Sequence, residues 1–208
     1  MDLSGLPYLV DSMRDRDIPT VSAIERTVFR SPWSESAFRS ELAHHDTACY
    51  LVLRYVPWLP TGPSAWRARL REHRQAALIE ASLLGYGGFW HIVDEGHICT
   101  LAVRPAWRGR GLGELLLLSL IERAIQEGAE VMTLEVRVSN LVAQQLYAKF
   151  GFERVGQRKN YYSEDQEDAW IMTTGAVRSL AYQQALAELA TKLRERLLNE
   201  DQAPPAST

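Results

Sequence analysis

The run Arg-Gly-Arg-Gly-Leu-Gly at residues 108–113 constrains the fold of this chain more than any other part of the sequence. Its glycines alternate with other residues, and a leucine-rich segment, 112–121, overlaps its end. Glycine adopts left-handed backbone conformations at little cost, so this spacing predicts a tight turn from a strand into a helix. The first N–H groups of a helix have no partner within it and can bind an anion. The run is therefore either a phosphate-binding loop or a tight turn that binds nothing.

Two common phosphate-binding motifs do not fit this run. A P-loop ends in Gly-Lys-Ser or Gly-Lys-Thr, whereas Gly113 is followed by Glu114. The dinucleotide fingerprint needs glycine or alanine three residues after its second glycine, and that position is again Glu114. What remains is a turn whose N–H groups hold a pyrophosphate without a metal ion, with Arg108 and Arg110 adding positive charge at the rim.

Hydrophobic periodicity and turn residues place the other elements. We expect strands at 8–13, 47–56, 76–93, 95–103, 131–138, 152–162 and 167–174, with a hairpin turn near 94–96. We expect helices at 18–29, 35–43, from 112 to near Gly128, at 139–150 and at 176–199. This order predicts an α/β fold with a mixed sheet of about seven strands.

Composition and charge limit the class of protein. Of the 208 residues, 46% are hydrophobic and 24% charged, which suits one ordinary domain with extensions. The net charge of −3 argues against extensive nucleic-acid binding. The two cysteines, Cys49 and Cys99, indicate free thiols in a reducing compartment. The sequence shows neither a signal peptide nor an apolar run long enough to span a membrane, so we expect a cytoplasmic protein.

At this point the chain resembles a known family. The run RGRGLG, preceded by the strand end LAV, fits the Arg/Gln-x-x-Gly-x-Gly/Ala motif of the GCN5-related N-acetyltransferases (GNAT). The segments FRSPWSESAF, LEVRVSNLVAQQLYAKFGF and RKNYYSEDQEDAWIM are similar to those of the ribosomal-protein-alanine N-acetyltransferases within that superfamily. The resemblance covers roughly residues 10–58 and 78–174.

The resemblance implies a GNAT fold, with a mixed, mostly antiparallel sheet of about seven strands flanked by four helices. It implies an acetyl-CoA-dependent domain at 1–175, and the inserted Pro/Arg-rich loop at 57–77 departs from the compact family pattern. An extra amphipathic C-terminal helix at 176–200 and a disordered tail at 201–208 complete the chain. The insert is either a surface loop or a contact for RNA or an acidic partner. The helix packs either on its own domain or on a second copy.

Acetyl-CoA is the donor that the resemblance implies, with no metal ion. Its pyrophosphate would lie on the glycine loop, and its pantetheine arm along the end of the preceding strand. The implied cofactor-binding residues are Leu101, Ala102, Val103, Arg108, Gly109, Arg110, Gly111, Leu112, Gly113, Glu114 and Asn140. The Val103 N–H would stabilise the oxyanion if its strand separates from the neighbouring strand. Asn140 has an alternative role as a helix N-cap.

Two catalytic residues are proposed from the sequence. Glu135 lies mid-strand between apolar neighbours, where a carboxylate is costly. The family match makes it the general base; otherwise it faces solvent or pairs with Arg137. Tyr147, on the following helix, matches the general acid that protonates the leaving thiolate, and its alternative is packing beside neighbouring apolar residues. His91 and His97 are interpreted as structural.

The acceptor side is assigned to aromatic and acidic residues. Trp33, Tyr161 and Tyr162 would clamp an extended peptide, and Glu35 would meet a basic second residue. Packing of Trp33 in the core is the alternative. The acidic stretch 164–168 either suits a basic peptide or is simply solvated.

The resulting hypothesis is direct acetyl transfer from acetyl-CoA to the N-terminal alanine of a small-subunit ribosomal protein. An acetyltransferase for lysine or a small amine is the nearest alternative, and a non-catalytic acetyl-CoA-binding module is an alternative of another class. We expect a monomer or weak dimer, with no membrane or nucleic-acid contact.

Overall fold

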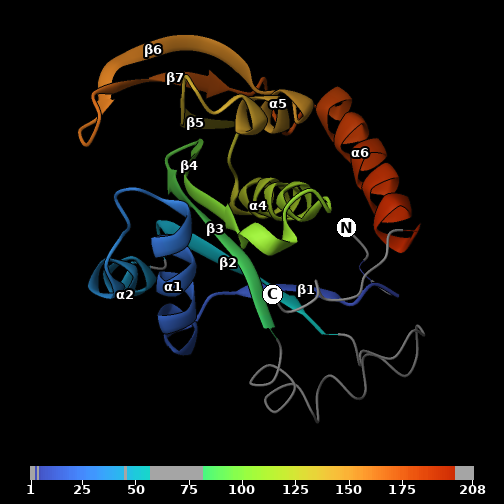
Figure 1. Cartoon of the computed structure of the whole chain (residues 1–208). Helices are drawn as coiled ribbons and strands as arrows, with labels where there is room; N and C mark the ends of the chain where they lie inside the picture. Colours follow the sequence, from blue (N-terminus) through green and yellow to red (C-terminus); the bar gives the residue numbers. More distant parts are fainter. Residues whose placement is uncertain (1–2, 4, 45, 57–81, 200–208) are drawn as a thin grey trace.

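The computed structural model describes residues 3, 5–44, 46–56 and 82–199 and contains a seven-stranded sheet (Figure 1). The strands are β1 (Tyr8–Ser12), β2 (Ala48–Tyr55), β3 (Ser82–Ile92), β4 (Glu95–Val103), β5 (Val131–Arg137), β6 (Glu153–Tyr162) and β7 (Glu167–Thr173). Their order across the sheet is β1-β2-β3-β4-β5-β7-β6. Strands β4 and β5 are parallel, and the other pairs are antiparallel. The expected mixed, mostly antiparallel sheet is confirmed.

Five α-helices surround the sheet in the described residues. They are α1 (Ile18–Val28), α2 (Glu35–Ala43), α4 (Leu112–Glu127), α5 (Leu141–Lys149) and α6 (Leu180–Asn199). Short 3₁₀ turns precede α1 and α4: η1 (Asp15–Asp17) and η2 (Pro105–Trp107). The Ser34 hydroxyl accepts a hydrogen bond from the Ala37 N–H and caps α2 as expected. The inserted loop at 57–77, the start of the third strand at 76–81 and the tail at 201–208 lie outside the described residues.

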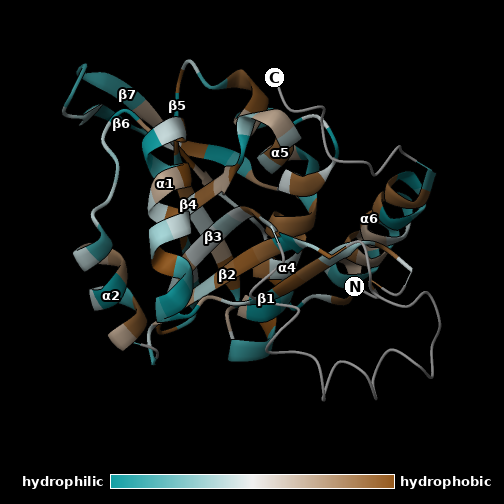
Figure 2. Cartoon of the chain, turned by 60° about the horizontal axis from the view of Figure 1, so that its bottom comes forward, coloured by the Kyte–Doolittle hydropathy of each residue, from teal (hydrophilic) through white to brown (hydrophobic). Residues whose placement is uncertain are grey.

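The sheet separates two hydrophobic clusters, which explains the layered arrangement. Helices α1 and α2 cover one face, and α4, α5 and α6 lie on the other (Figure 1). Hydrophobic residues line the strands between these layers (Figure 2). The leucines of α4 are fully buried around the helix, because α4 packs between the sheet and α6.

The C-terminal helix packs on its own domain. Leu186, Leu193 and Leu197 are buried in the same cluster as the leucines of α4. The Tyr182 hydroxyl donates to the Phe150 carbonyl at 2.8 Å. Helix α6 starts at Leu180 and not at 176 as expected. The N–H of buried Val177 is bonded to the Glu130 carbonyl, and Val177 and Arg178 form a turn before the helix.

The β3–β4 hairpin turns one residue earlier than expected. Val93 and Asp94 form the turn, and Glu95 already pairs with Ile92. Val93 has φ 59° and is 91% exposed. A β-branched residue in the left-handed region is strained by about 1–2 kcal/mol. The packing of both strands fixes this register, and the resulting backbone strain lies at Val93.

Replacing Val93 with asparagine is expected to raise the free energy of unfolding by about 1 kcal/mol, since asparagine tolerates positive φ. Urea denaturation measures the change. Val155→Asn is the control, because Val155 is also an exposed hydrophobic residue, 64% accessible, but lies in strand β6. A midpoint for Val93→Asn at or below that of the wild type would contradict the strain.

Within the described residues, the helices are all too short or too polar to cross a membrane.

Candidate active site

The glycine loop forms the expected tight turn between β4 and α4. Gly109 and Gly111 adopt left-handed conformations, with φ 78° and 72°. Gly111 is the N-cap of α4 and has no side chain to accept the first-turn N–H groups of the helix. Alternation of left-handed glycines with other residues directs successive N–H groups into an anion-binding concavity. The loop therefore has the backbone geometry that a pyrophosphate requires.

Charged side chains surround this loop, but most of them are engaged. The Arg108 Nε donates to the Val103 carbonyl at 3.2 Å, and the Arg110 guanidinium lies 5.0 Å from the Trp107 ring centroid. Glu114, in the first turn of α4, pairs with Lys149 of α5 and Arg196 of α6. Lys149 and Arg196 were not among the site residues predicted from the sequence, because α5 and α6 come close to the glycine loop only after the chain has folded.

Strands β4 and β5 separate beside the glycine loop. Their parallel pairing runs from Glu95–Val131 to Ile98–Leu134 and ends there. Beyond this point β4 stays paired with β3, and β5 stays paired with β7. The separation expected from the sequence is therefore present.

The backbone of β4 points polar groups into this separation. The Arg104 N–H donates to the Leu84 carbonyl of β3 at 2.8 Å. Because these groups alternate along an antiparallel strand, the N–H groups of Leu101 and Val103 point away from β3, toward β5. The side chains of Ala102 and Leu112 are buried in the core. By the same alternation the N–H of Ala102 points toward β3, so Ala102 does not offer it to a ligand in the separation, whereas Leu112, in the first turn of α4, can meet a ligand through its backbone.

Glu135 lies on β5 where the two strands separate, with a side chain only 6% exposed. One carboxylate oxygen contacts the His97 Nε2 at 2.9 Å, and the other contacts the Arg158 Nε at 2.9 Å. These contacts, led by the His97 hydrogen bond, lower the pKa of Glu135. The carboxylate is therefore ionised and held in place.

The structure excludes one alternative for Glu135 and corrects one interpretation of His97. The alternative that Glu135 pairs with Arg137 does not hold, because Arg137 contacts acidic residues at the β6–β7 turn instead. His97 was interpreted as a histidine without a carboxylate partner, yet it contacts both Glu135 and, at 3.8 Å, Glu95. The hydrogen bond to Glu135 raises the pKa of His97.

Helix α5 follows β5 and carries Tyr147, with Asn140 as its N-cap. Tyr147 is buried and packs on Phe152, with 5.8 Å between ring centroids. Burial raises the pKa of Tyr147, so its phenol stays protonated and can act as a hydrogen-bond donor. The Asn140 Oδ1 accepts the Ala143 N–H at 3.2 Å, which is the N-cap role. Gln144, missed from the sequence, fixes α5 by donating to two backbone carbonyls at the end of β5.

Trp33 belongs to an aromatic stack that leads to His97. Its ring lies 6.4 Å from the Trp90 ring at 19°, and Trp90 lies 5.8 Å from the His97 ring at 22°. The Trp33 N–H donates to Glu25 at 3.0 Å, and burial raises the pKa of Glu25 to about 7. Trp33 therefore packs within the domain, as its alternative interpretation held. It is also the outermost ring of the aromatic stack that ends at His97, which contacts Glu135.

The other acceptor residues differ in their surroundings. Glu35 pairs with Arg39 one helical turn away, at 3.0 Å, which is a helix-stabilising contact. Tyr161 and Tyr162 pack edge to face at 5.2 Å. The Arg158 guanidinium lies 5.6 Å from the Tyr161 ring centroid, so Arg158 links this tyrosine to Glu135.

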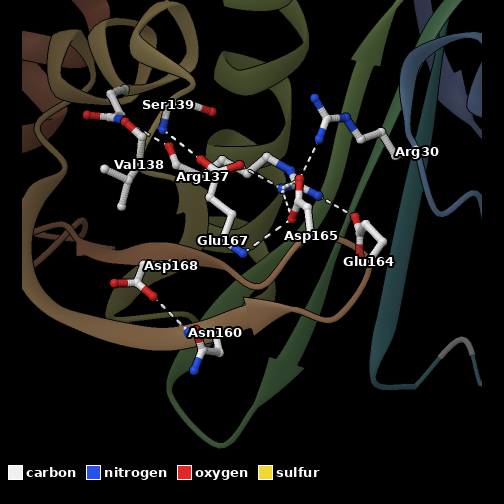
Figure 3. A network of polar contacts seen from close by, with 10 residues as sticks. Arg30, Arg137, Val138, Ser139, Asn160, Glu164, Asp165, Glu167 and Asp168 are labelled. Atoms are coloured by element: carbon white, nitrogen blue, oxygen red, sulfur yellow. Dashed lines mark hydrogen bonds and ion pairs between the residues drawn. The ribbon is translucent and has the colours of Figure 1, made fainter.

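Two arginines contact three of the four acidic residues in the stretch 164–168. Arg137 contacts Glu164, Asp165 and Glu167, and Arg30 from the α1–α2 loop also contacts Asp165 (Figure 3). Asp168 accepts the N–H of Asn160, which has φ 52° (Figure 3). The stretch is therefore not simply solvated. Through Arg30, it connects the α1–α2 loop, which carries Trp33, to the β6–β7 turn beside Tyr161 and Tyr162.

The comparisons with known proteins agree with this geometry. The model of the acetyltransferase (GNAT) family matches residues 19–152. The chain belongs to the GNAT family. Members of the family use acetyl-CoA, which suits the glycine loop described above.

Named relatives of this GNAT chain share most of its length. A Bacillus subtilis protein, provisionally named a ribosomal protein bS18-alanine N-acetyltransferase, is 38% identical over 163 residues, covering 78% of this chain and 92% of that protein. The ribosomal protein bS18-alanine N-acetyltransferase of Escherichia coli K12 is 29% identical, with coverage of 78% and 94%. The crystal structure of the Escherichia coli ribosomal-protein-S18-alanine N-acetyltransferase has a TM-score of 0.61 at 27% identity, covering 80% of this chain and 92% of that one.

No group of three or more His, Cys, Asp or Glu residues that could hold a metal ion occurs in the part of the chain that the structure describes. Cys49 and Cys99 are free thiols, and burial raises the pKa of each to about 12. Neither is suited to act as a nucleophile at neutral pH.

Proposed function

We propose that this chain acetylates the α-amino group of a protein N-terminus that begins with alanine, and that the protein is ribosomal protein bS18. The names of the relatives support the target. The observation that carries the proposal is the position of Glu135, a buried and ionised carboxylate at the separation of β4 and β5, beside the loop that suits acetyl-CoA.

The described residues fit acetyl-CoA as donor. The left-handed glycines and the open N-terminus of α4 suit its pyrophosphate. The N–H of Leu101 suits its pantetheine arm, which would extend along β4 like an added strand. When bound, acetyl-CoA supplies the activated acetyl thioester. Of the basic residues, Arg108 and Arg110 are proposed at the phosphate rim.

Loss of a proton from the acceptor amine is the first chemical requirement. An α-amino group has a pKa near 8 and a lysine near 10.4, so the lysine costs about 3 kcal/mol more to deprotonate at neutral pH. Glu135 has a low pKa and is a modest base, and this favours the α-amino group as acceptor.

The remaining steps need hydrogen-bond donors at fixed positions. The Val103 N–H points into the separation and would stabilise the negative charge that develops on the thioester oxygen. Tyr147 keeps its proton at neutral pH and would donate to the departing sulfur. Trp33, Tyr161 and Tyr162 would line the path of the acceptor peptide, and Glu35 would lie farther out on α2.

Two short peptides test the acceptor class. One begins Ala-Arg, has a free N-terminus and contains no lysine, and the other has a blocked N-terminus and one lysine. With acetyl-CoA, mass spectrometry is expected to show acetylation of the first peptide alone. Acetylation of the second alone would overturn the proposal in favour of a lysine or small-amine acceptor. Binding of acetyl-CoA with no transfer to any amine would indicate a binding module.

A further inference from the structure

The C-terminal helix α6 brings a basic side chain to the glycine loop. The match to the GNAT family model ends at residue 152, whereas α6 begins at Leu180, so α6 lies outside the part of the chain that the model covers. Arg196 lies in the last turn of α6. A Cβ built on Gly111 would lie 2.7 Å from the Arg196 Nη2 and 3.4 Å from its Nε. The guanidinium therefore lies against the backbone of the left-handed residue that forms the N-cap of α4.

Both an ion pair and apolar packing hold this guanidinium beside the loop. The Arg196 Nη2 lies 2.5 Å from one carboxylate oxygen of Glu114, in the first turn of α4. The other oxygen of Glu114 pairs with Lys149 at the end of α5. Leu193 is buried and lies 3.1 Å from the Cβ built on Gly111, so it anchors this part of α6 on α4 (Figure 1). The position of Arg196 is thus set by packing as well as by charge.

Arg196 and Lys149 change the electrostatics beside Glu114 from repulsive to attractive for an anion. A lone carboxylate in the first turn of α4 would repel a second anion at the same helix end. The two cations offset this charge and leave the three side chains with one net positive charge. The Arg196 side chain is 39% exposed and that of Glu114 only 18%, so a ligand at the loop reaches the guanidinium more readily than the carboxylate.

We infer that Arg196 binds a phosphate group of acetyl-CoA, which makes α6 a part of the donor site. Acetyl-CoA carries a pyrophosphate and a ribose 3′-phosphate, so it brings several negative charges to the loop. A guanidinium is planar and has five N–H donors, so it can contact a carboxylate and a phosphate at the same time. Hydrogen bonds from a guanidinium to a phosphate are charge-assisted and stronger than neutral ones. This inference rests on the proposed function, because it assumes that acetyl-CoA is the donor at the glycine loop.

The alternative role for Arg196 is to hold α6 on the domain through Glu114. A basic residue in the last turn of a helix also interacts favourably with the helix dipole. The two roles differ in what the loss of the charge changes. A purely structural role alters the stability of α6, whereas a phosphate contact alters the affinity for acetyl-CoA in a way that depends on salt.

Isothermal titration calorimetry with acetyl-CoA, without any acceptor, tests the inference. Arg196→Gln is compared with the wild type and with Lys192→Gln, which removes the same charge from an exposed position on α6. At low ionic strength we expect the Kd of Arg196→Gln to be about tenfold higher than that of the wild type. The Kd of Lys192→Gln is expected to stay within about twofold of the wild type. Equal Kd values for the two variants would overturn the inference.

The same titration at high ionic strength separates a phosphate contact from a distortion of the loop. Salt screens exposed charges, since the Debye length falls from about 10 Å at 0.1 M to about 3 Å at 1 M. We expect the ratio of the Kd of Arg196→Gln to that of the wild type to fall toward one at 1 M salt. A ratio that is the same at both salt concentrations would show that the substitution acts through packing, and would overturn the inference.

Titration with 3′-dephospho-acetyl-CoA, which keeps the pyrophosphate, identifies the phosphate group. If Arg196→Gln weakens the binding of this ligand about tenfold as well, the guanidinium contacts the pyrophosphate. If the effect occurs with acetyl-CoA alone, the guanidinium contacts the 3′-phosphate, and either result agrees with the inference. A wild type that binds neither ligand would instead remove acetyl-CoA as the donor and overturn the proposed function. Tight binding that Arg196→Gln leaves unchanged would overturn the inference and leave the proposed function intact.

Discussion

Glu135→Gln is expected to lower kcat for peptide acetylation by about 10²–10⁴-fold and to leave acetyl-CoA binding within about twofold of the wild type. Glutamine has nearly the shape of glutamate and can still accept a hydrogen bond from Arg158, but it cannot take a proton. The Glu135 carboxylate contacts His97 and Arg158 rather than residues of the glycine loop, so the cofactor affinity is not expected to change. Single-turnover acetyl transfer, followed by mass spectrometry, measures the chemical step.

Glu153→Gln is the matched control for this substitution. Glu153 is an exposed carboxylate on β6, at the far edge of the sheet, and its loss is expected to leave kcat unchanged. Full activity of Glu135→Gln would remove Glu135 as the base. A loss of acetyl-CoA binding equal to the loss of kcat would assign the residue to cofactor binding.

The pH dependence of stability offers an independent check on the same residue. The pKa of Glu135 is lower in the folded state than its unfolded value of about 4.3. Its charge therefore stabilises the fold at pH above that value, and the contribution is lost as the pH falls through the folded pKa. The difference in unfolding free energy between wild type and Glu135→Gln is expected to shrink on acidification from neutral pH.

Local signals in the sequence were sufficient for the elements and for the glycine loop. Ser34 begins α2 and Gly128 ends α4 through contacts within a few residues, so the sequence predicts both helix ends. The same is true of Gly109 and Gly111, where the spacing itself requires left-handed backbone. The family match added the mostly antiparallel character of the sheet and the proposed role of Glu135, neither of which follows from local pattern.

The partners of Glu135 were beyond such reasoning, because they depend on long-range register. His97 reaches Glu135 through the parallel pairing of β4 with β5, and Arg158 reaches it from β6 across β7. Pairing with Arg137 was one alternative for Glu135, but the β6–β7 turn places three acidic side chains around Arg137. The spacing of residues in the sequence does not give the distances between these side chains. They depend on which residues of neighbouring strands pair with each other.

Gly111→Ala is the second substitution with a large expected effect. Gly111 has φ 72°, and an added Cβ would lie 2.7 Å from the Arg196 Nη2 and 3.1 Å from Leu193. The Arg196 side chain can move aside, but Leu193 must give way by a few tenths of an ångström, and alanine at this φ is strained. We expect a loss of about 1–3 kcal/mol in the free energy of unfolding, from the strain and the lost packing.

The same substitution is expected to weaken acetyl-CoA binding at least about tenfold, because the N–H groups of the loop lose their common direction. Gly113→Ala is the control on the same helix. A Cβ at Gly113 meets only Leu146, at an ordinary 3.6 Å, and alanine favours the helix, so this variant should be as stable as the wild type or more stable. Thermal unfolding and calorimetric titration with acetyl-CoA separate the two effects. If Gly111→Ala unfolds at a lower temperature but binds acetyl-CoA normally, the left-handed backbone at Gly111 serves the packing of α6 and not the pyrophosphate.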